Sequence, residues 1–269
     1  MAEKSIAGEA CLQNLIFAVM KKHGIVLFLL LAFYGCEEKI EIVKIKTQFG
    51  EIMVYLYDET PNHKANFLKL ARNGFFNGTT FHRIIEGFMI QGGDPNSKDN
   101  DPMNDGDGGP EFTGEAGTFP DPVNGKTYSI DAEIKPGIYH KRGVIAAARE
   151  SDDINPEKRS SGSQFYLVQG RIYTDEELTA YAIKRSLTLN EDQRKLYTTL
   201  GGTPHLDGRY TVFGEIVSGY EVVEKIAKQA KDGRDRPITN IEMTVEVLKV
   251  KPRQLVKKYG YNIPKVQAK

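Results

Sequence analysis

The stretch that decides the fold runs from Phe81 to Pro95 and reads Phe-His-Arg-Ile-Ile-Glu-Gly-Phe-Met-Ile-Gln-Gly-Gly-Asp-Pro. Two short apolar runs separated by a Glu-Gly pair are typical of two strands joined by a tight turn. The stretch carries a guanidinium at Arg83, an amide at Gln91 and two large apolar side chains at Phe88 and Met89. This combination suits grasping a peptide rather than cutting one.

Two further motifs follow along the chain. Residues 162–166 read Gly-Ser-Gln-Phe-Tyr, and residues 206–214 read Leu-Asp-Gly-Arg-Tyr-Thr-Val-Phe-Gly. Together with the first stretch they closely resemble the cyclophilin family of peptidyl-prolyl cis–trans isomerases, in the same order. The resemblance implies a mainly β fold, a closed eight-stranded antiparallel barrel capped by two helices, one over each open end.

The resemblance also implies a set of site residues. The catalytic positions would be Arg83, Phe88, Met89 and Gln91. The substrate-binding positions would be Ala148, Arg149, Gln164, Tyr166, His205, Leu206 and Tyr210. Many cyclophilins carry phenylalanine at Tyr166, tryptophan at His205 and histidine at Tyr210, and this chain has no tryptophan. The two tyrosines keep an aromatic body, so proline binding is expected to survive, whereas His205 offers a cyclosporin-like macrocycle less apolar area than an indole would.

Such a site would act without covalent chemistry. An X-Pro bond rotates slowly because amide resonance gives a barrier of about 18–20 kcal/mol. A site that binds the twisted amide better than either planar form is sufficient, so neither a cofactor nor a metal is expected. Arg83 would donate to the prolyl nitrogen, which accepts a hydrogen bond only when the amide is twisted. The alternative is a non-catalytic peptide-binding module or holdase chaperone that uses the same groove.

The composition is ordinary for a globular protein and narrows the choice of partners. The chain has 269 residues, 40% hydrophobic and 27% charged, and its 36 Lys and Arg balance its 36 Asp and Glu. This balance gives no global field to attract nucleic acid, so any partner must be recognised locally. The resemblance implies that the partners are proline-containing, unfolded or flexible polypeptides. Its five histidines lack the short spacings of a metal site.

The N-terminal region has the pattern of an export signal. From Met20 the chain reads Met-Lys-Lys-His-Gly, followed by an apolar run over Ile25–Tyr34 and then Gly35-Cys36. This pattern resembles a bacterial lipoprotein signal, which predicts an exported protein anchored in a membrane through acylated Cys36 and facing the periplasm or cell exterior. A conventional secretory signal or an uncleaved interfacial anchor are the alternatives. The acidic residues before Met20 suggest that translation starts there, not at Met1.

The chain divides into three parts on this interpretation. Residues 1–39 form the N-terminal extension and signal, residues 40–251 the cyclophilin-like domain, and residues 252–269 a basic tail expected to be frayed or loosely docked. Two insertions interrupt the domain. A surface loop rich in Asp, Gly, Pro and Asn spans about 96–128, and a helical hairpin spans about 171–204. The hairpin is expected at the rim of the groove, either as a specificity element or as a passive decoration.

Local patterns predict the individual elements. A strand hairpin is predicted over Ile40–Lys46 and Glu51–Tyr57, a helix beginning at Pro61, and another helix over Tyr220–Ala227. The inserted hairpin should begin with a capping box formed by Thr174 and Glu177, with its second helix starting near Glu191. Further short strands are predicted over Thr80–Ile84, Phe88–Gln91, Val144–Ala147, Gln164–Val168, Thr211–Glu215 and Ile241–Val250.

Overall fold

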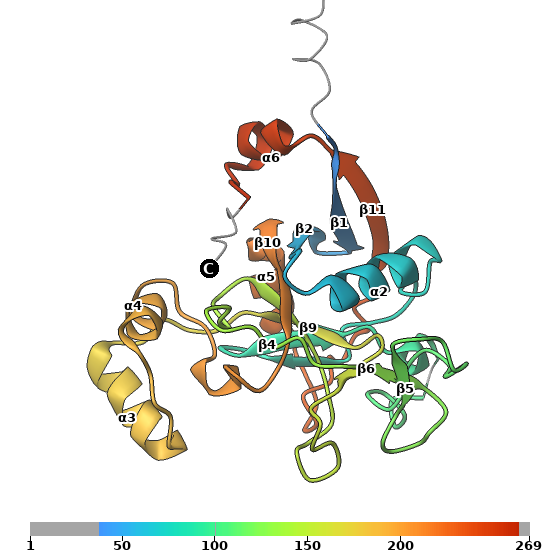
Figure 1. Ribbon diagram of the computed structural model, residues 1–269, viewed down its shortest axis with the longest axis horizontal. Coiled ribbons are helices and arrows are strands. Elements are labelled where there is room, and N and C mark those ends of the chain that lie inside the picture. Colours follow the sequence, from blue (N-terminus) through green and yellow to red (C-terminus); the bar gives the residue numbers. More distant parts are fainter. Residues whose placement is uncertain (1–37, 100, 264–269) are drawn as a thin grey trace, which may run out of the picture.

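The structure is a computed structural model that describes residues 38–99 and 101–263 (Figure 1). Cys36 and the predicted signal lie outside the described residues. The strands are β1 (Ile40–Thr47), β2 (Gly50–Leu56), β3 (Arg83–Ile85), β4 (Met89–Gly92), β5 (Thr118–Pro120), β6 (Tyr128–Ile130), β7 (Val144–Ala147), β8 (Ser160–Ser161), β9 (Phe165–Val168), β10 (Val212–Ser218) and β11 (Thr244–Val250). The α-helices are α2 (Pro61–Arg72), α3 (Asp175–Arg185), α4 (Glu191–Thr199), α5 (Tyr220–Ala227) and α6 (Pro252–Tyr259).

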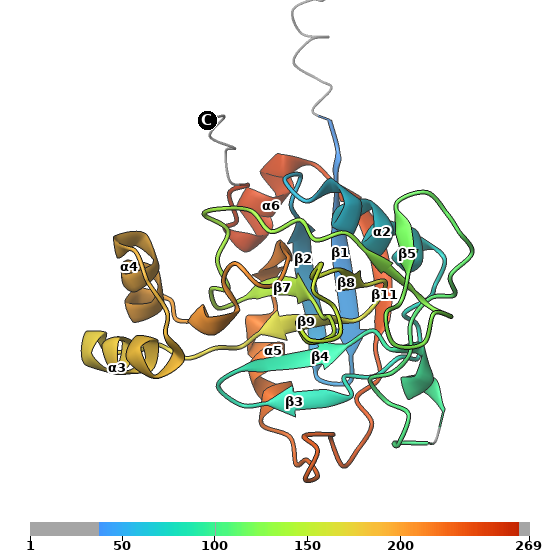
Figure 2. The same ribbon diagram turned by 60° about the horizontal axis from the view of Figure 1, so that its bottom comes forward.

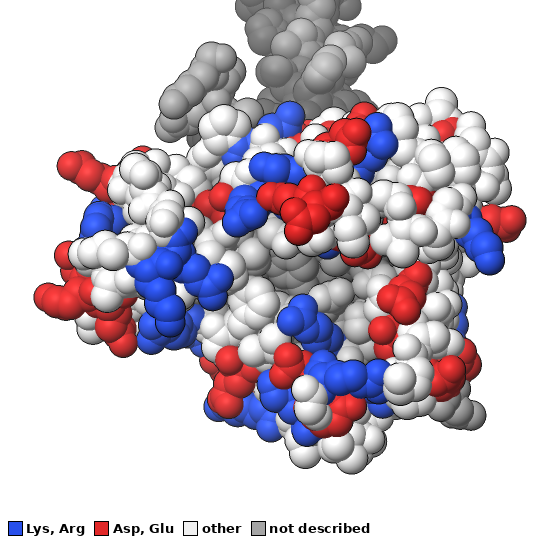
Figure 3. Space-filling model, turned by 90° about the horizontal axis from the view of Figure 1, so that it is seen from below, with Lys and Arg blue, Asp and Glu red and all other residues white. Residues whose placement is uncertain are grey.

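Eight of the strands form one sheet in the order β11-β1-β2-β10-β7-β9-β4-β3. Every neighbouring pair in it is antiparallel. The described part of the fold is therefore mainly β, and the expected eight-stranded antiparallel sheet is confirmed. Figure 2 shows β7, β9, β4 and β3 side by side, which is the part of the sheet that carries the predicted site. Figure 3 shows the molecule from below, where Lys and Arg side chains are interspersed with Asp and Glu side chains.

Both faces of this sheet are covered, and β2 shows how the sequence achieves this. Successive side chains of a strand point to opposite faces. The inward set of β2 is Ile52, Val54 and Leu56, and the outward set, continuing past its end, is Met53, Tyr55 and Tyr57. All six side chains are buried, so the strand reads as a continuous apolar run.

Helices α2 and α5 pack on the inner face, and both match their predictions. Pro61 opens α2, where its fixed φ and missing N–H suit the first helical turn. Helix α5 has the predicted bounds, Tyr220–Ala227. The two helices contribute to one apolar core with the strands, through Phe67, Leu68, Leu70, Ala71, Val222, Val223, Ile226 and Ala227.

The predicted surface loop over residues 96–128 contains more structure than expected. Its strand β5 pairs with β6, which in turn pairs with β8, giving a separate three-stranded sheet. The buried carboxylate of Asp94 anchors the loop by accepting hydrogen bonds from the backbone N–H groups of Asn96, Gly106 and Gly108. The β5-β6 pairing is local, but its strands are only three residues long and lie in a segment rich in Gly, Pro and Asp, and the β6-β8 pairing joins segments about thirty residues apart, so local composition did not reveal them.

The inserted helices α3 and α4 form the predicted hairpin and stand beside the sheet as an arm (Figures 1 and 2). The predicted capping box between Thr174 and Glu177 is present. The arm has a small core of its own, built on Tyr173, Leu178 and Tyr197.

The C-terminal region differs from its prediction. Residues 252–259 form α6 instead of a loosely docked tail, with Pro252 in its first turn and Gly260 as its left-handed C-cap. The side chain of Leu255 is fully buried on the outer face of the sheet. The helix is short and amphipathic, with only a narrow apolar stripe. Because its other residues are mostly basic or polar, the composition of this segment does not indicate a packed helix.

Replacing Leu255 by alanine should lower the free energy of unfolding by about 2–4 kcal/mol, because it removes a fully buried side chain. The matched control is Val256→Ala on the same helix, whose side chain is 48% exposed and which should change stability by less than about 0.5 kcal/mol. Urea denaturation measures both. Equal midpoints for the two variants would show that α6 is not docked.

Candidate active site

The outer face of the sheet carries a cavity of about 170 Å³ at the β3-β4-β9-β7 side. Its lining is Arg83, Phe88, Met89, Gln91, Ala148, Arg149, Tyr166, Leu206 and Tyr210. These are nine of the eleven residues that the sequence predicts for catalysis and substrate binding, brought together from the three motifs and from the segment that holds Ala148 and Arg149. We call this hollow the prolyl cavity.

The pairing of β3 with β4 positions the polar groups at its edge. Arg83 lies opposite Gln91 in the antiparallel register, and Ile85 lies opposite Met89. Ile84 and Ile90, the pair between these two, pack into the inner core. Because side chains alternate along a strand, the guanidinium of Arg83, the thioether of Met89 and the amide of Gln91 point to the outer face. Gly87 makes the turn between the strands at a φ of +76°, which favours glycine.

Arg83 is held loosely at the rim. Its side chain is 45% exposed, and its Nε lies 4.0 Å from Oδ2 of Asp235. That separation is too long for a hydrogen bond, and an exposed ion pair of this kind contributes at most about 1 kcal/mol. The guanidinium can therefore turn toward a bound amide at little cost.

Gln91 is oriented from behind by Gln164, one of the two predicted residues that do not line the cavity. Nε2 of Gln91 donates to Oε1 of Gln164 over 3.1 Å. Gln164 in turn donates from its own Nε2 to the carbonyl oxygens of Gly106 and Gly108, at 2.7 and 2.9 Å. These hydrogen bonds use the Nε2 group of Gln91 and leave its Oε1 as the acceptor that can face a substrate N–H.

Arg149 lines the cavity but its charge is engaged elsewhere. Its side chain is 2% exposed, with Nη2 2.5 Å from Oδ1 of Asp152 and the guanidinium carbon 4.5 Å from the ring centre of Tyr210. At Ala148 the backbone N–H donates to the Gln164 carbonyl, and the carbonyl accepts from Ser161. These two residues therefore shape the wall, and Arg149 fixes the ring of Tyr210.

His205 is the other predicted residue that the cavity lining does not include. Its ring packs against Phe88 with centroids 5.3 Å apart, and its Nδ1 lies 2.8 Å from the hydroxyl of Tyr181 on α3. Burial lowers the pKa of His205 to about 4, so the ring is neutral at pH 7. His205 thus supports Phe88 from behind and joins it to the helical arm.

The sequence did not reveal a buried hydrogen-bond chain under the cavity floor. Nε2 of His140 lies 3.1 Å from the hydroxyl of Tyr166, and Nδ1 lies 3.1 Å from Oδ1 of Asp207. Burial lowers the pKa of His140, so the imidazole is neutral. Its Nδ1–H then donates to the carboxylate, and its Nε2 accepts from the tyrosine hydroxyl.

The same carboxylate ties the floor to the helical arm. Oδ2 of Asp207 accepts from Nε2 of Gln193 at 2.8 Å and from the hydroxyl of Tyr197 at 2.6 Å, both on α4. The arm therefore connects to Tyr166 through Asp207 and His140. One signal in the sequence pointed this way: a tyrosine at the position of a buried phenylalanine needs a partner for its hydroxyl.

A small apolar cavity edged by a guanidinium and an amide, on a sheet of this topology, has the chemistry to accommodate a short polypeptide segment. Comparison with known proteins narrows the class. The sequence model of the family described as cyclophilin type peptidyl-prolyl cis-trans isomerase/CLD matches residues 42–247. The chain belongs to the cyclophilin-type peptidyl-prolyl cis–trans isomerase family.

Individual relatives agree with this membership. A putative peptidyl-prolyl cis-trans isomerase of Staphylococcus saprophyticus is 32% identical over 194 residues, which cover 72% of this chain and 84% of the relative. A putative bifunctional phosphatase/peptidyl-prolyl cis-trans isomerase of Streptococcus pyogenes is 34% identical over 211 residues, which cover 76% of this chain but only 38% of that longer protein.

A solved structure agrees as well. The crystal structure of a cyclophilin type peptidyl-prolyl cis-trans isomerase of Cryptosporidium parvum in the presence of the dipeptide Ala-Pro aligns with a TM-score of 0.52 and 25% identity. The alignment covers 78% of this chain and 98% of the other. The expected cyclophilin-like fold is thereby confirmed.

Replacing Asp207 by asparagine should lower the free energy of unfolding by about 2–4 kcal/mol, because an amide cannot accept all four hydrogen bonds of the carboxylate. Asp192→Asn, an exposed change on α4, is the control and should have little effect. Urea denaturation of both variants measures how much the hydrogen bonds of Asp207 contribute to stability. Equal stability would contradict the role assigned to Asp207.

Proposed function

We propose that the protein catalyses the cis–trans isomerisation of X-Pro bonds in exported, unfolded or flexible polypeptides and so assists their folding. The observation that carries this proposal is the placement of Arg83 and Gln91 on the rim of an apolar cavity walled by Phe88, Met89 and Leu206. The apolar wall would hold the proline ring, and the two polar groups would hold the amide that turns.

The energetics support a donor at this position. An acceleration of about five orders of magnitude requires roughly 7 kcal/mol of differential stabilisation. A guanidinium that donates to the pyramidal prolyl nitrogen makes this bond only near the top of the barrier, so the whole bond lowers the barrier. Removal of water from the amide by the apolar wall would supply the remainder.

Family membership favours this enzyme over a non-catalytic peptide binder or holdase. A pure binder gains nothing from a guanidinium directed at a nitrogen that is no acceptor in either planar form. In this chain Arg83 is retained, lies on the prolyl cavity, and is bound only loosely to Asp235.

We also propose that the main sheet closes into a barrel. Residues just before β3 approach residues just before β11, with backbone N–H to O distances of 2.9 Å from Phe81 to Ile241 and 3.0 Å from Gly78 to Met243. A further bond runs back from Met243 to Thr79 over 2.8 Å. These bonds support contact between the two edge strands of the sheet.

The proposed site of action is outside the cytoplasm, on a membrane. It is supported by the basic segment, the apolar run and the Gly35-Cys36 pair at the N-terminus. No helix within residues 38–99 and 101–263 meets the length and hydropathy needed to cross a bilayer. An acyl chain on Cys36 together with a second lipid would give stable attachment.

Replacing Arg83 by alanine should reduce kcat/KM for an X-Pro tetrapeptide about 100-fold, because the loss of one preorganised charged donor has an effect of this size. Arg72→Ala is the matched control, since Arg72 pairs with Glu41 and lines no part of the prolyl cavity. A protease-coupled assay measures the rates. If wild type, both variants and buffer share one rate, the protein is no isomerase, and client binding by the same groove becomes the better explanation.

In bacterial cells grown with labelled palmitate, the wild-type protein should incorporate label and sediment with membranes. Cys36→Ala should remain unlabelled, and Cys11→Ala should behave as wild type. Label retained in the Cys36 variant would contradict the predicted anchor.

A further inference from the structure

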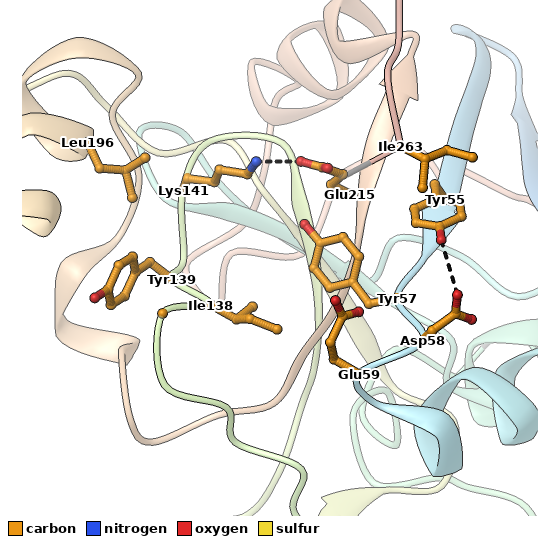
Figure 4. Close-up of a pocket in the computed structure, with 11 residues that line it drawn as sticks. Tyr55, Tyr57, Asp58, Glu59, Ile138, Tyr139, Lys141, Leu196, Glu215 and Ile263 are labelled. Atoms are coloured by element: carbon orange, nitrogen blue, oxygen red, sulfur yellow. Dashed lines mark hydrogen bonds and ion pairs between the residues drawn. The ribbon is translucent and has the colours of Figure 1, made fainter. Parts of the chain in front are cut away.

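A second cavity, of about 330 Å³, shares no lining residue with the prolyl cavity. It lies where the end of β2 meets the segment of residues 137–141, helix α4 and the segment after α6 (Figure 4). Its lining is Tyr55, Tyr57, Asp58, Glu59, Gly137, Ile138, Tyr139, Lys141, Leu196, Glu215 and Ile263. Nothing in the isomerase function assigns it a role.

One of its three carboxylates is fully engaged within the protein. Glu215 is 8% exposed, with Oε2 2.5 Å from Nζ of Lys141 and Oε1 accepting from the Tyr261 hydroxyl at 2.6 Å. Burial and the Glu215 carboxylate raise the pKa of Tyr57, which keeps its hydroxyl protonated as a further donor. Glu215 therefore belongs to the internal structure.

The other two carboxylates are engaged to different degrees. Asp58 forms an ion pair with Nζ of Lys64 at 2.6 Å and lies 3.5 Å from the Tyr55 hydroxyl. Glu59 is half-buried, and within the described part of the chain its carboxylate has no hydrogen bond or ion pair. Three carboxylates and two ammonium groups leave one negative charge, and it belongs to Glu59.

Aromatic and apolar side chains surround this charge. Figure 4 shows the Glu59 side chain directed toward the ring of Tyr57, and the Glu59 charge contributes to the raised pKa of that tyrosine. Tyr139 stands on the opposite wall, where Asn190 holds its hydroxyl at 3.0 Å. Ile138, Leu196 and Ile263 complete an apolar lining.

We propose that this cavity binds the side chain of a lysine or arginine from a polypeptide. Such a side chain has an apolar stem, which matches the aliphatic lining, and a terminal cation, which matches Glu59 and the tyrosine faces. Anionic ligands would meet a net negative lining. Within the described residues there is also no group of three His, Cys, Asp or Glu that could hold a metal.

The site goes beyond the proposed isomerase activity and does not depend on it. The two cavities are neighbours across one segment of the chain. Tyr139 and Lys141 line the second cavity, and His140, which lies between them in the sequence, forms a hydrogen bond with Tyr166 of the prolyl cavity. A client that places a basic residue near a proline could therefore contact both cavities.

The test uses a proline-free, fluorescein-labelled hexapeptide with one central arginine, and the same peptide with citrulline, which keeps the shape but removes the charge. Fluorescence anisotropy at low ionic strength should show that wild type binds the arginine peptide roughly three- to tenfold more tightly. Glu59→Gln should abolish most of this preference. Glu242→Gln, an exposed carboxylate that lines neither cavity, should retain it.

Because both peptides lack proline, failure here leaves the isomerase assignment untouched. A second measurement needs no variant: 0.5 M NaCl should reduce the preference of wild type for the arginine peptide, because salt screens the attraction between charges. Equal affinity of wild type for the two peptides, or an undiminished preference in Glu59→Gln, would overturn the proposal.

Discussion

The antiparallel pairing of β3 with β4 is the constraint on which the site depends. It sets Arg83 opposite Gln91, and the alternation of strand side chains then buries Ile84 and Ile90 on one face while it presents both polar groups on the other. A slip of one residue would exchange the two faces and place a guanidinium in the inner core. Core packing and the site therefore select the same register.

The site combines a firmly held floor with a loosely held rim. Under the floor, Tyr166, His140 and Asp207 form a buried chain in which each unsatisfied group would cost about 1–3 kcal/mol. At the rim, the long contact between Arg83 and Asp235 is worth at most about 1 kcal/mol. This difference lets the guanidinium follow an amide as it turns, while the wall against which a proline ring would rest stays in place.

Local sequence signals predicted the helices whose ends are set by interactions between residues close in the sequence. The bounds of α5, the start of α2 at Pro61 and the capping box of α3 follow from periodicity and capping chemistry. The small β5-β6-β8 sheet was missed because its strands are only two or three residues long and its β6-β8 pairing joins distant segments. Helix α6 was missed because its stability comes from burying Leu255 against the main sheet, which composition does not show.

The site was predicted from the residues that match the family pattern, so residues outside that pattern were not found. Nine predicted residues line the prolyl cavity. Gln164 orients Gln91 from behind, and His205 supports Phe88, so their contribution is indirect. His140 lies outside every motif, and its role follows only from the three-dimensional position of Tyr166. The most direct test of the account is a crystal structure with a bound X-Pro peptide. It should show the proline ring against Phe88, Met89 and Leu206 with the Arg83 guanidinium within hydrogen-bonding distance of the prolyl amide. A peptide bound with Arg83 remote from that amide would contradict the account.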